Sequence, residues 1–346
     1  MNKNKLDIIA YEIVEGCNLK CNFCARNATH GSINQLNLDQ VDYLLSLLKK
    51  FGVPPQVALT GGEPLLHNDI IEITKKIEKY NISYSITTNG TIINEDLLEF
   101  LHHSKLFRHF IISVDSSDKQ IHNKIRGVEN SFDKTNKFIQ FVKKYNINFC
   151  INMTVSNENL LDIYKTVEWA KKIGAKDISI ATVKPSGRGK AVLNFDELLI
   201  FSQQIKKSQK LIDSIFSVWV PEITIFLYDF KNYEDSYLSG EKYSCGFGNG
   251  SLHVDFFGNV KGCATCDYPL GNVYTHGFDL LDFWNNSEIL CKIRDKHNLT
   301  GYCRTCKYVD FCGGCRCRAF AINGNLFGDD PYCPIIQKGI DYEKYV

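Results

Sequence analysis

The sequence lacks both an apolar run of the roughly 18 residues that a membrane-spanning helix needs and a secretory signal at its start. Its first residues, Met-Asn-Lys-Asn-Lys-Leu-Asp, lead directly into a short apolar segment. We therefore expect a cytoplasmic protein with no membrane partner.

The sequence also lacks an excess of charge of either sign, since it has 40 Lys and Arg residues and 39 Asp and Glu residues. This balance argues neither for nor against binding to nucleic acid, and we expect no nucleic-acid partner. Internal repeats and low-complexity tracts are absent as well. A chain of 346 residues is long enough for a full core and favours two domains.

Cysteine, by contrast, is abundant, with 14 residues, and it is unevenly placed. Three cysteines lie within residues 17–24, one is Cys150, and ten lie between Cys245 and Cys333. Many cysteines without a secretion signal favour metal ligation over disulfides, so a secreted disulfide-bonded protein is the weaker interpretation. Isolated core cysteines would not cluster in this way.

From residue 6 to about residue 210, apolar segments that suit strands alternate with segments that suit helices. The expected strands span residues 8–14, 56–60, 84–88, 110–114, 148–155 and 177–183. The expected helices span residues 38–51, 69–80, 94–102, 131–145, 158–173 and 195–210. Six such units in series predict a parallel sheet with right-handed crossovers, closed into a partial (β/α)6 barrel. Its functional groups should lie at the carboxyl ends of the strands.

Residues 216–228 suggest an extra strand and connector, and from about residue 240 the chain becomes rich in Cys and Gly. We place a boundary near residues 235–244. The sequence thus predicts an α/β domain over residues 1–235 and a small cysteine-rich α+β domain over residues 236–346.

The first cysteine group, Cys17, Cys21 and Cys24, lies in the run Cys-Asn-Leu-Lys-Cys-Asn-Phe-Cys. Three thiolates can bind three irons of a [4Fe–4S] cube and leave the fourth iron open for a substrate or cosubstrate. This spacing after an apolar strand resembles that of the radical S-adenosylmethionine enzymes. Gly61-Gly62-Glu63-Pro64, at the end of the second expected strand, is by itself a common turn. After the triplet, it resembles the family's motif for the methionine amino group.

The resemblance implies further contacts to S-adenosylmethionine at the strand ends. Thr87-Thr88-Asn89-Gly90 ends the third strand, and Thr154 is a further candidate for the ribose. Asp115 suits a loop-ordering carboxylate as well as a substrate contact, and Arg188, in the loop 183–189, suits a solvated residue as well as a ligand. The expected cofactor contacts are Phe23, Gly61, Gly62, Glu63, Pro64, Ser113, Arg126, Asn152 and Val183. By the same resemblance, one-electron cleavage of S-adenosylmethionine yields a 5′-deoxyadenosyl radical that abstracts hydrogen, while the barrel orients the reactants and excludes water.

In the second group, Cys245 is followed by twelve residues, Gly258, four residues and Cys263, and then by a run of cysteines up to Cys333. This array resembles the SPASM domain, which carries auxiliary iron–sulfur clusters, and residues 251–261 suit its hairpin. The resemblance implies two clusters, of [4Fe–4S] or [2Fe–2S] type. One takes Cys245, Cys263 and the Cys315/Cys317 region, and the other takes Cys303, Cys306, Cys312 and Cys333.

The spacing after Cys312 departs from the family pattern, with two residues to Cys315 and four to Cys317, where the family has three. The run Cys-Gly-Gly-Cys-Arg-Cys resembles the pyrroloquinoline-quinone biosynthesis member, in which both cysteines of the Cys-Arg-Cys pair are ligands. Zinc is the alternative metal, since Cys-x₂-Cys pairs suit zinc ribbons. Cys150 suits a buried core position. Cys266 and Cys291 suit inert positions better than hydrogen donors to a substrate radical.

The leading functional hypothesis is a maturase of a ribosomally made peptide that forms a C–C or thioether crosslink or epimerises a residue. The alternatives are a tetrapyrrole-modifying enzyme of the haem d1 or alternative-haem type, a sulfatase-type protein maturase, and a non-catalytic iron–sulfur carrier. The last is disfavoured because a carrier needs no open iron. A flavodoxin- or ferredoxin-type electron donor is the expected redox partner. Because the first strand starts by about residue 8 and the 216–244 connector is short, a peptide leader would be recognised by a separate small protein, the barrel mouth or the C-terminal domain.

Overall fold

The computed structural model describes residues 5–31, 34–190, 192–221, 245–310 and 312–338. Its centre is a sheet in the order β12-β11-β10-β1-β4-β5-β6-β7-β8-β9. The strands from β10 through β1 to β9 run parallel to one another, as successive βα units require. The barrel strands are β1 (Ile8–Val14), β4 (Gln56–Gly61), β5 (Tyr84–Thr88), β6 (Phe107–Ser113), β7 (Phe149–Val155), β8 (Asp177–Thr182) and β9 (Ser217–Trp219).

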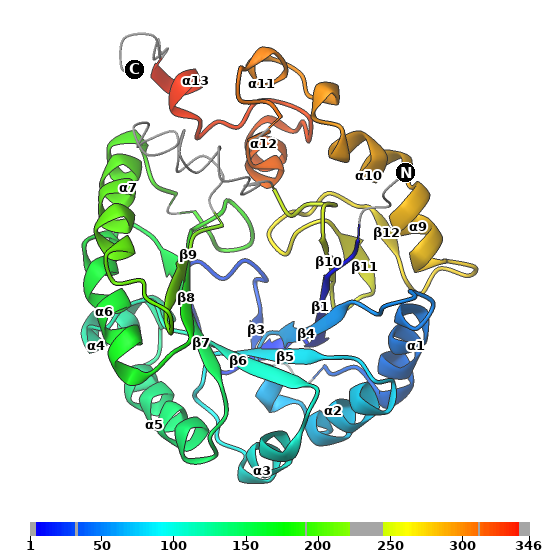
Figure 1. Ribbon diagram of the computed structural model, residues 1–346, viewed down its shortest axis with the longest axis vertical. Coiled ribbons are helices and arrows are strands. Elements are labelled where there is room, and N and C mark those ends of the chain that lie inside the picture. Colours follow the sequence, from blue (N-terminus) through cyan, green and yellow to red (C-terminus); the bar gives the residue numbers. More distant parts are fainter. Residues whose placement is uncertain (1–4, 32–33, 191, 222–244, 311, 339–346) are drawn as a thin grey trace.

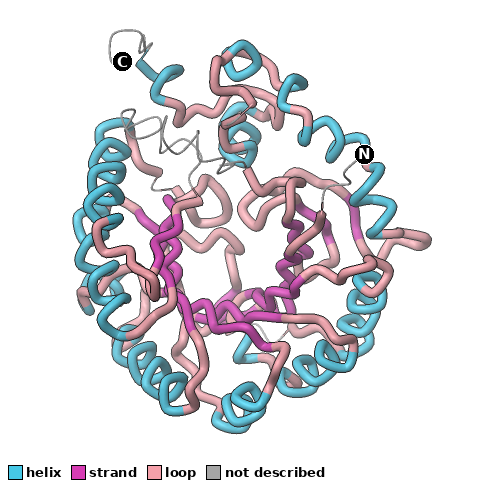
Figure 2. The backbone as a smooth tube through the Cα atoms, viewed as in Figure 1, coloured by secondary structure: helices cyan, strands magenta, loops and turns pink. Residues whose placement is uncertain are grey.

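Helices cover the outer face of this curved sheet, and the strands form the inner layer (Figures 1 and 2). The covering helices are α1 (Leu38–Leu48), α2 (Ile70–Lys79), α3 (Glu95–His103), α5 (Ser131–Lys144), α6 (Ile163–Ile173) and α7 (Phe195–Gln209). Helices α1 and α7 begin at capping boxes: the Asn37 side chain accepts the N–H groups of Asp39 and Gln40, and the Asn194 side chain accepts that of Glu197. The predicted alternation of six strands and six helices is therefore confirmed, with α4 (Lys119–Arg126) as an additional helix.

The strands are apolar along most of their length because helices cover one face and the barrel interior covers the other. Ile86, Phe110 and Ile151 are fully buried on three neighbouring strands. The Phe110 ring packs edge-on against Phe138 of α5, with ring centroids 5.2 Å apart. This packing fixes where the strands end, and so where the polar residues that follow them lie.

The C-terminal part of the chain extends the barrel's own sheet. Strand β10 (Ser251–Val254) pairs in parallel with β1, with Ile8 opposite Ser251 and Tyr11 opposite Val254. Strand β11 (Asn259–Lys261) returns antiparallel to β10, and β12 (Gly271–Asn272) pairs with β11. The predicted hairpin is thus present, with Gly258 at φ +83° in its turn. The boundary predicted near residues 235–244 lies outside the described residues.

Short elements after β12 lie across the open side of the barrel, between its first and last strands (Figure 1). They are α9 (Leu280–Asn286), α10 (Glu288–Arg294), α11 (Tyr302–Thr305), α12 (Arg316–Asn323) and α13 (Pro334–Lys338). The chain also forms the minor strands β2 (Gly16–Cys17) and β3 (Thr29–His30) and the 3₁₀ turn η1 (Pro64–Leu66). In the described part of the chain, no helix combines the length and the apolar character needed to cross a membrane.

The shared sheet predicts that the two halves unfold together. Leu252 of β10 is 2% exposed and belongs to the same core as β1. Leu252→Ala should lower the free energy of unfolding of the whole chain by about 2–5 kcal/mol, because it leaves a cavity where β10 meets the barrel. Calorimetry should show one transition shifted to lower temperature. The control Val53→Ala, at a position 70% exposed, should change stability by less than about 0.5 kcal/mol. Two separate transitions, of which only one shifts, would contradict this prediction.

Candidate active site

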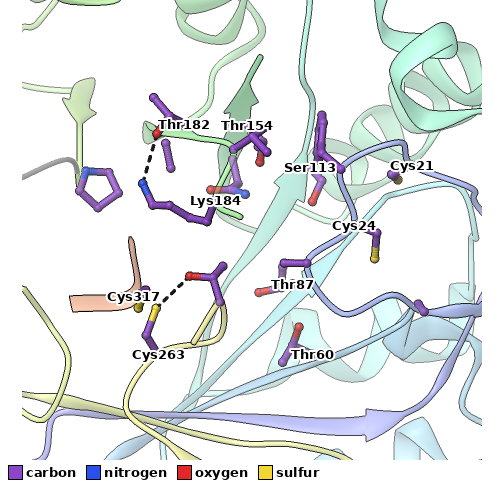
Figure 3. A pocket seen from close by; sticks show the side chains of 18 of the residues that line it. Cys21, Cys24, Thr60, Thr87, Ser113, Thr154, Thr182, Lys184, Cys263 and Cys317 are labelled. Atoms are coloured by element: carbon purple, nitrogen blue, oxygen red, sulfur yellow. Dashed lines mark hydrogen bonds between the residues drawn. The ribbon is translucent and has the colours of Figure 1, made fainter. Parts of the chain in front are cut away.

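A cavity of about 680 Å³ lies at the carboxyl ends of the barrel strands. Such a volume is typical of small-molecule sites. Its wall includes Cys17, Cys21 and Cys24 from the first cysteine group and Cys245, Cys263, Cys315 and Cys317 from the second. In Figure 3, Cys263 and Cys317 lie across the pocket from Cys21 and Cys24. One cavity therefore joins two groups of thiols that are more than 200 residues apart in sequence.

The first group lies on the cluster loop, residues 16–28, which follows β1. Backbone hydrogen bonds hold this loop against the end of α4: Lys20 N–H donates to the Arg126 carbonyl at 3.0 Å, and Asn22 N–H donates to the Ile125 carbonyl at 3.1 Å. On its other side, Glu63 N–H donates to the Gly16 carbonyl at 2.9 Å. The loop is therefore fixed by backbone contacts that do not depend on which side chains it carries.

Two glycines permit the close approach of other backbone segments to the cluster loop. A Cβ on Gly62 would lie 2.0 Å from the Gly16 carbonyl oxygen, and one on Gly187 would lie 2.4 Å from the Cys24 carbonyl oxygen. Any other residue would displace the loop, and Gly187 also has φ +56°. The adjacent Arg188 donates its backbone N–H to the Cys24 carbonyl and its Nε to the Cys21 carbonyl, at 2.9 and 3.0 Å. Arg188 thus braces the loop, a role that the sequence did not suggest.

Hydrogen-bond donors point at two of the three sulfurs of the first group, those of Cys17 and Cys21. Leu19 N–H donates to Cys17 Sγ at 3.4 Å and Asn89 Nδ2 at 3.8 Å, while an Arg126 guanidinium nitrogen approaches Cys21 Sγ at 3.7 Å. Burial raises the pKa of Cys17 to about 12, so its thiol stays protonated until a metal displaces the proton. Donors aimed at buried sulfurs suit thiolates that carry an iron–sulfur cluster. The three cysteines therefore fit the cluster that the sequence implies.

Glu63 is fully buried, and its carboxylate joins two strand ends. One oxygen accepts the Thr88 hydroxyl at 2.7 Å and Leu65 N–H at 3.1 Å, and the other accepts Asn89 N–H at 2.7 Å. Burial raises the pKa of Glu63, and these hydrogen bonds oppose that shift. Glu63 lines the cavity, as an ammonium-binding residue must, and it also anchors the turn that carries Asn89.

Arg126 forms a buried ion pair with Asp115, with Nε 2.6 Å from Oδ2. Burial alone would lower the pKa of the Arg126 guanidinium, but the Asp115 carboxylate and the Cys21 sulfur raise it, whereas burial raises the pKa of Asp115. Asp115 also accepts the Thr154 N–H at 3.1 Å and does not line the cavity, whereas Arg126 does. Asp115 therefore orders this region, which matches one of its two expected roles.

The other expected cofactor contacts were predicted at the strand ends, and most of them line the cavity. Ser113 and Thr154 point into it in Figure 3, and so do Thr182 and Lys184, which were not among the expected contacts. Pro64 is not part of the described cavity wall. Those on the wall are Phe23, Gly61, Gly62, Glu63, Ser113, Arg126, Asn152 and Val183.

A buried network of three ionisable residues, not expected from the sequence, joins the cluster loop to the C-terminal part. Arg26 of the loop forms an ion pair with Glu12 of β1. His253 Nε2 of β10 lies 2.5 Å from Glu12 Oε1 and 2.8 Å from an Arg26 guanidinium nitrogen. Burial alone would raise the pKa of Glu12, but the His253 hydrogen bond and the Arg26 charge lower it to about 2.

The second group divides into two sites. Four of its cysteines line the main cavity: Cys245, Cys263, Cys315 and Cys317. The remaining four expected ligands line a separate small pocket together with Asp330: Cys303, Cys306, Cys312 and Cys333. The cysteines of each implied ligand set thus line one pocket, and the ligand assignment itself stays a prediction.

Across the described ranges, no three His, Cys, Asp or Glu side chains form a group that could hold one ion. Cys150 is buried as expected, with its thiol 2.9 Å from an Asp177 carboxylate oxygen, and Cys291 is exposed.

Comparison with known proteins gives the following similarities. A sequence model of the radical SAM superfamily matches residues 11–170, and one of the SPASM iron–sulfur cluster-binding domain matches residues 245–307. An AdoMet-dependent heme synthase of Methanosarcina barkeri is 29% identical over 340 residues, covering 94% of this chain and 95% of that protein. The antilisterial bacteriocin subtilosin biosynthesis protein AlbA of Bacillus subtilis is 25% identical, covering 93% and 69%.

Among solved structures, Streptococcus suis SuiB bound to its precursor peptide SuiA has the same fold. The TM-score is 0.73 at 19% identity, and the match covers 96% of this chain and 76% of SuiB.

The triplet geometry predicts a selective loss of iron. Cys17→Ala, Cys21→Ala or Cys24→Ala should each abolish S-adenosylmethionine cleavage and remove one cluster, because each removes one of only three thiolates. The iron held by the second group should remain, since those ligands lie on other elements. Iron analysis and electron paramagnetic resonance after anaerobic reconstitution would measure this. The exposed Cys291→Ala is the matched control and should keep all iron. Cleavage by any triplet variant would contradict the assignment.

Proposed function

We propose that this chain, which belongs to the radical S-adenosylmethionine enzymes with a SPASM domain, oxidises the propionate side chains of an iron tetrapyrrole. The observation that carries the proposal is the similarity to the heme synthase of M. barkeri. That match extends over nearly the full length of both proteins. The similarity to AlbA covers a smaller share of that protein.

The cavity suits a large, mostly apolar substrate that carries carboxylates. Phe23, Trp219 and Phe247 contribute aromatic surface to its wall, and Lys184 brings an ammonium group into it. Lys184 Nζ lies 3.2 Å from the Thr182 hydroxyl, at the end of β8. A carboxylate bound by this ammonium would lie between the two cysteine groups, since both line the same cavity.

The overall conversion of one propionate to a vinyl group releases one hydrogen atom, one carbon dioxide and one electron. Bound S-adenosylmethionine and its cluster would supply the acceptor for the hydrogen atom. The released electron needs an acceptor near the substrate, and the Cys245, Cys263, Cys315 and Cys317 site is on the cavity wall. Glu63 and Arg126 would orient S-adenosylmethionine, and the buried wall would exclude water. A flavodoxin- or ferredoxin-type protein would supply the reducing electron.

A peptide is the second candidate substrate, and the edge of the sheet favours it. Strand β9 is the last strand of the sheet in the described part of the chain, and its Trp219 lines the cavity. An extended peptide could pair with this edge and place one residue in the cavity. A separate leader-binding protein would then supply further recognition.

Anaerobic incubation with S-adenosylmethionine, reductant and iron coproporphyrin III separates the two candidates. The tetrapyrrole proposal predicts a product that has lost carbon dioxide and two hydrogens for each propionate converted, with 5′-deoxyadenosine formed in step. Mass spectrometry measures both. The opposite result would favour the peptide candidate. In that case iron coproporphyrin III stays unchanged, and a peptide encoded beside the gene loses two hydrogens or takes up deuterium from the solvent.

Lys184 gives a prediction about substrate binding. Lys184→Gln should weaken iron coproporphyrin III binding by about tenfold or more, because it removes the charge that pairs with a substrate carboxylate. S-adenosylmethionine binding should be unchanged. Lys190→Gln, at an exposed position in the loop after β8, is the matched control and should bind both as the native chain does. Equal affinity in the two variants would remove Lys184 from the substrate site.

A further inference from the structure

Arg316 is a buried cation without an anionic partner among the described residues. It lies between Cys315 and Cys317, in the first turn of α12, and is 3% exposed. One guanidinium nitrogen donates to the Leu326 and Gly328 carbonyls at 3.0 and 2.6 Å. Its Nε and its other terminal nitrogen have no hydrogen-bond partner in the described part of the chain. A buried charge in this state is costly unless an anion completes its surroundings.

The carboxylates close to this segment are bound to other groups. Asp330 binds Arg318 through both oxygens, at 2.9 and 2.7 Å, so these two charges offset each other. Asp329 accepts two backbone N–H groups at the start of α11. Within the described ranges, no ion pair joins either carboxylate to Arg316. The charge of Arg316 is therefore uncompensated, whereas that of Arg318 is balanced.

The guanidinium of Arg316 lies directly behind the wall of the second auxiliary site. That site is the small pocket lined by Cys303, Cys306, Cys312 and Cys333. Gly314 is part of its wall, and a Cβ on Gly314 would lie 2.8 Å from a terminal nitrogen of Arg316. Only a glycine therefore leaves room for the guanidinium here. Burial raises the pKa of the Cys303 thiol to about 12, and the Arg316 charge opposes that shift.

We propose that Arg316 is the counter-charge for the iron–sulfur cluster of the second auxiliary site and raises its reduction potential. A cluster with four thiolate ligands is an anion, and its reduced state carries one more negative charge than its oxidised state. A fixed cation nearby stabilises the reduced state more, and burial limits screening by water. Cys315 and Cys317 line the main cavity, whereas Arg316 does not. The inference does not depend on which substrate the enzyme takes.

Bracing of the loop 326–328 is the alternative role, since Arg316 binds two of its carbonyls. That role needs hydrogen-bond donors but no charge, so a neutral amide could supply it. It also gives no function to the two guanidinium nitrogens without partners. Gln at this position keeps donors without the charge, and Lys keeps the charge with fewer donors. These two variants therefore separate the two roles.

The test uses the full chain with Cys17, Cys21 and Cys24 replaced by Ala, so that only the auxiliary sites hold iron. At a fixed applied potential, Arg316→Gln should lower the ratio of reduced to oxidised form of one cluster at least tenfold, about 59 mV for one electron. Arg316→Lys should shift this midpoint much less. Potentiometric titration followed by electron paramagnetic resonance measures both. An unchanged midpoint in Arg316→Gln, or equal shifts in the two variants, would overturn the proposal.

Arg304→Gln is the matched control, because Arg304 is an exposed arginine next to Cys303 and water screens its charge. It should change the same ratio by less than about twofold. Cys306→Ala, which removes an expected ligand of the second site, identifies the cluster that responds. In that background Arg316→Gln should leave the remaining midpoint unchanged. A shift that persists there would refute the assignment of Arg316 to the second site.

Iron content covers the case in which Arg316→Gln no longer holds the second cluster. Arg316→Lys should then keep the iron that the Gln variant loses, because a positive charge retains an anion and a neutral amide does not. Equal loss of iron from both variants would contradict the proposal. Iron kept by Arg316→Gln but lost by Arg316→Lys would do the same and would assign Arg316 to loop bracing alone.

Discussion

The active site depends on the backbone clamp around the cluster loop. Three segments that follow different strands meet this loop: the Gly61–Pro64 turn, the end of α4, and the Gly187–Arg188 turn. Each donates or accepts backbone hydrogen bonds, and the glycines allow the chains to approach closely. These bonds involve only the backbone of the cluster loop, so they place no requirement on the loop's side chains. The three cysteines are therefore held by the barrel as a whole.

The Glu12, Arg26 and His253 network connects this clamp to the C-terminal part. Glu12 lies on β1, which pairs with β10 on one side and β4 on the other. Removing one member would leave buried charge without its partner, which is costly. The network and the shared sheet thus fix the first cysteine group relative to the second.

The sequence predicted the repeating strands and helices and both cysteine groups, because apolar periodicity and cysteine spacing are local signals. It did not predict the pairing of β10 with β1, which joins residues about 240 positions apart. Nor did it predict the Arg188 brace or the His253 network. Such contacts depend on how distant segments approach one another, and a lone Arg or His in a loop carries no mark of its partner.

The two auxiliary sites differ in their access to the cavity. The first site opens into the cavity, whereas the second lines its own small pocket. Between them lies Asp330, which binds Arg318 through both oxygens and accepts the Cys315 N–H at 2.8 Å. This carboxylate therefore positions a ligand of the first site while it borders the second. Under the proposed function, a cluster held at the first site would therefore be the electron acceptor nearer to the substrate.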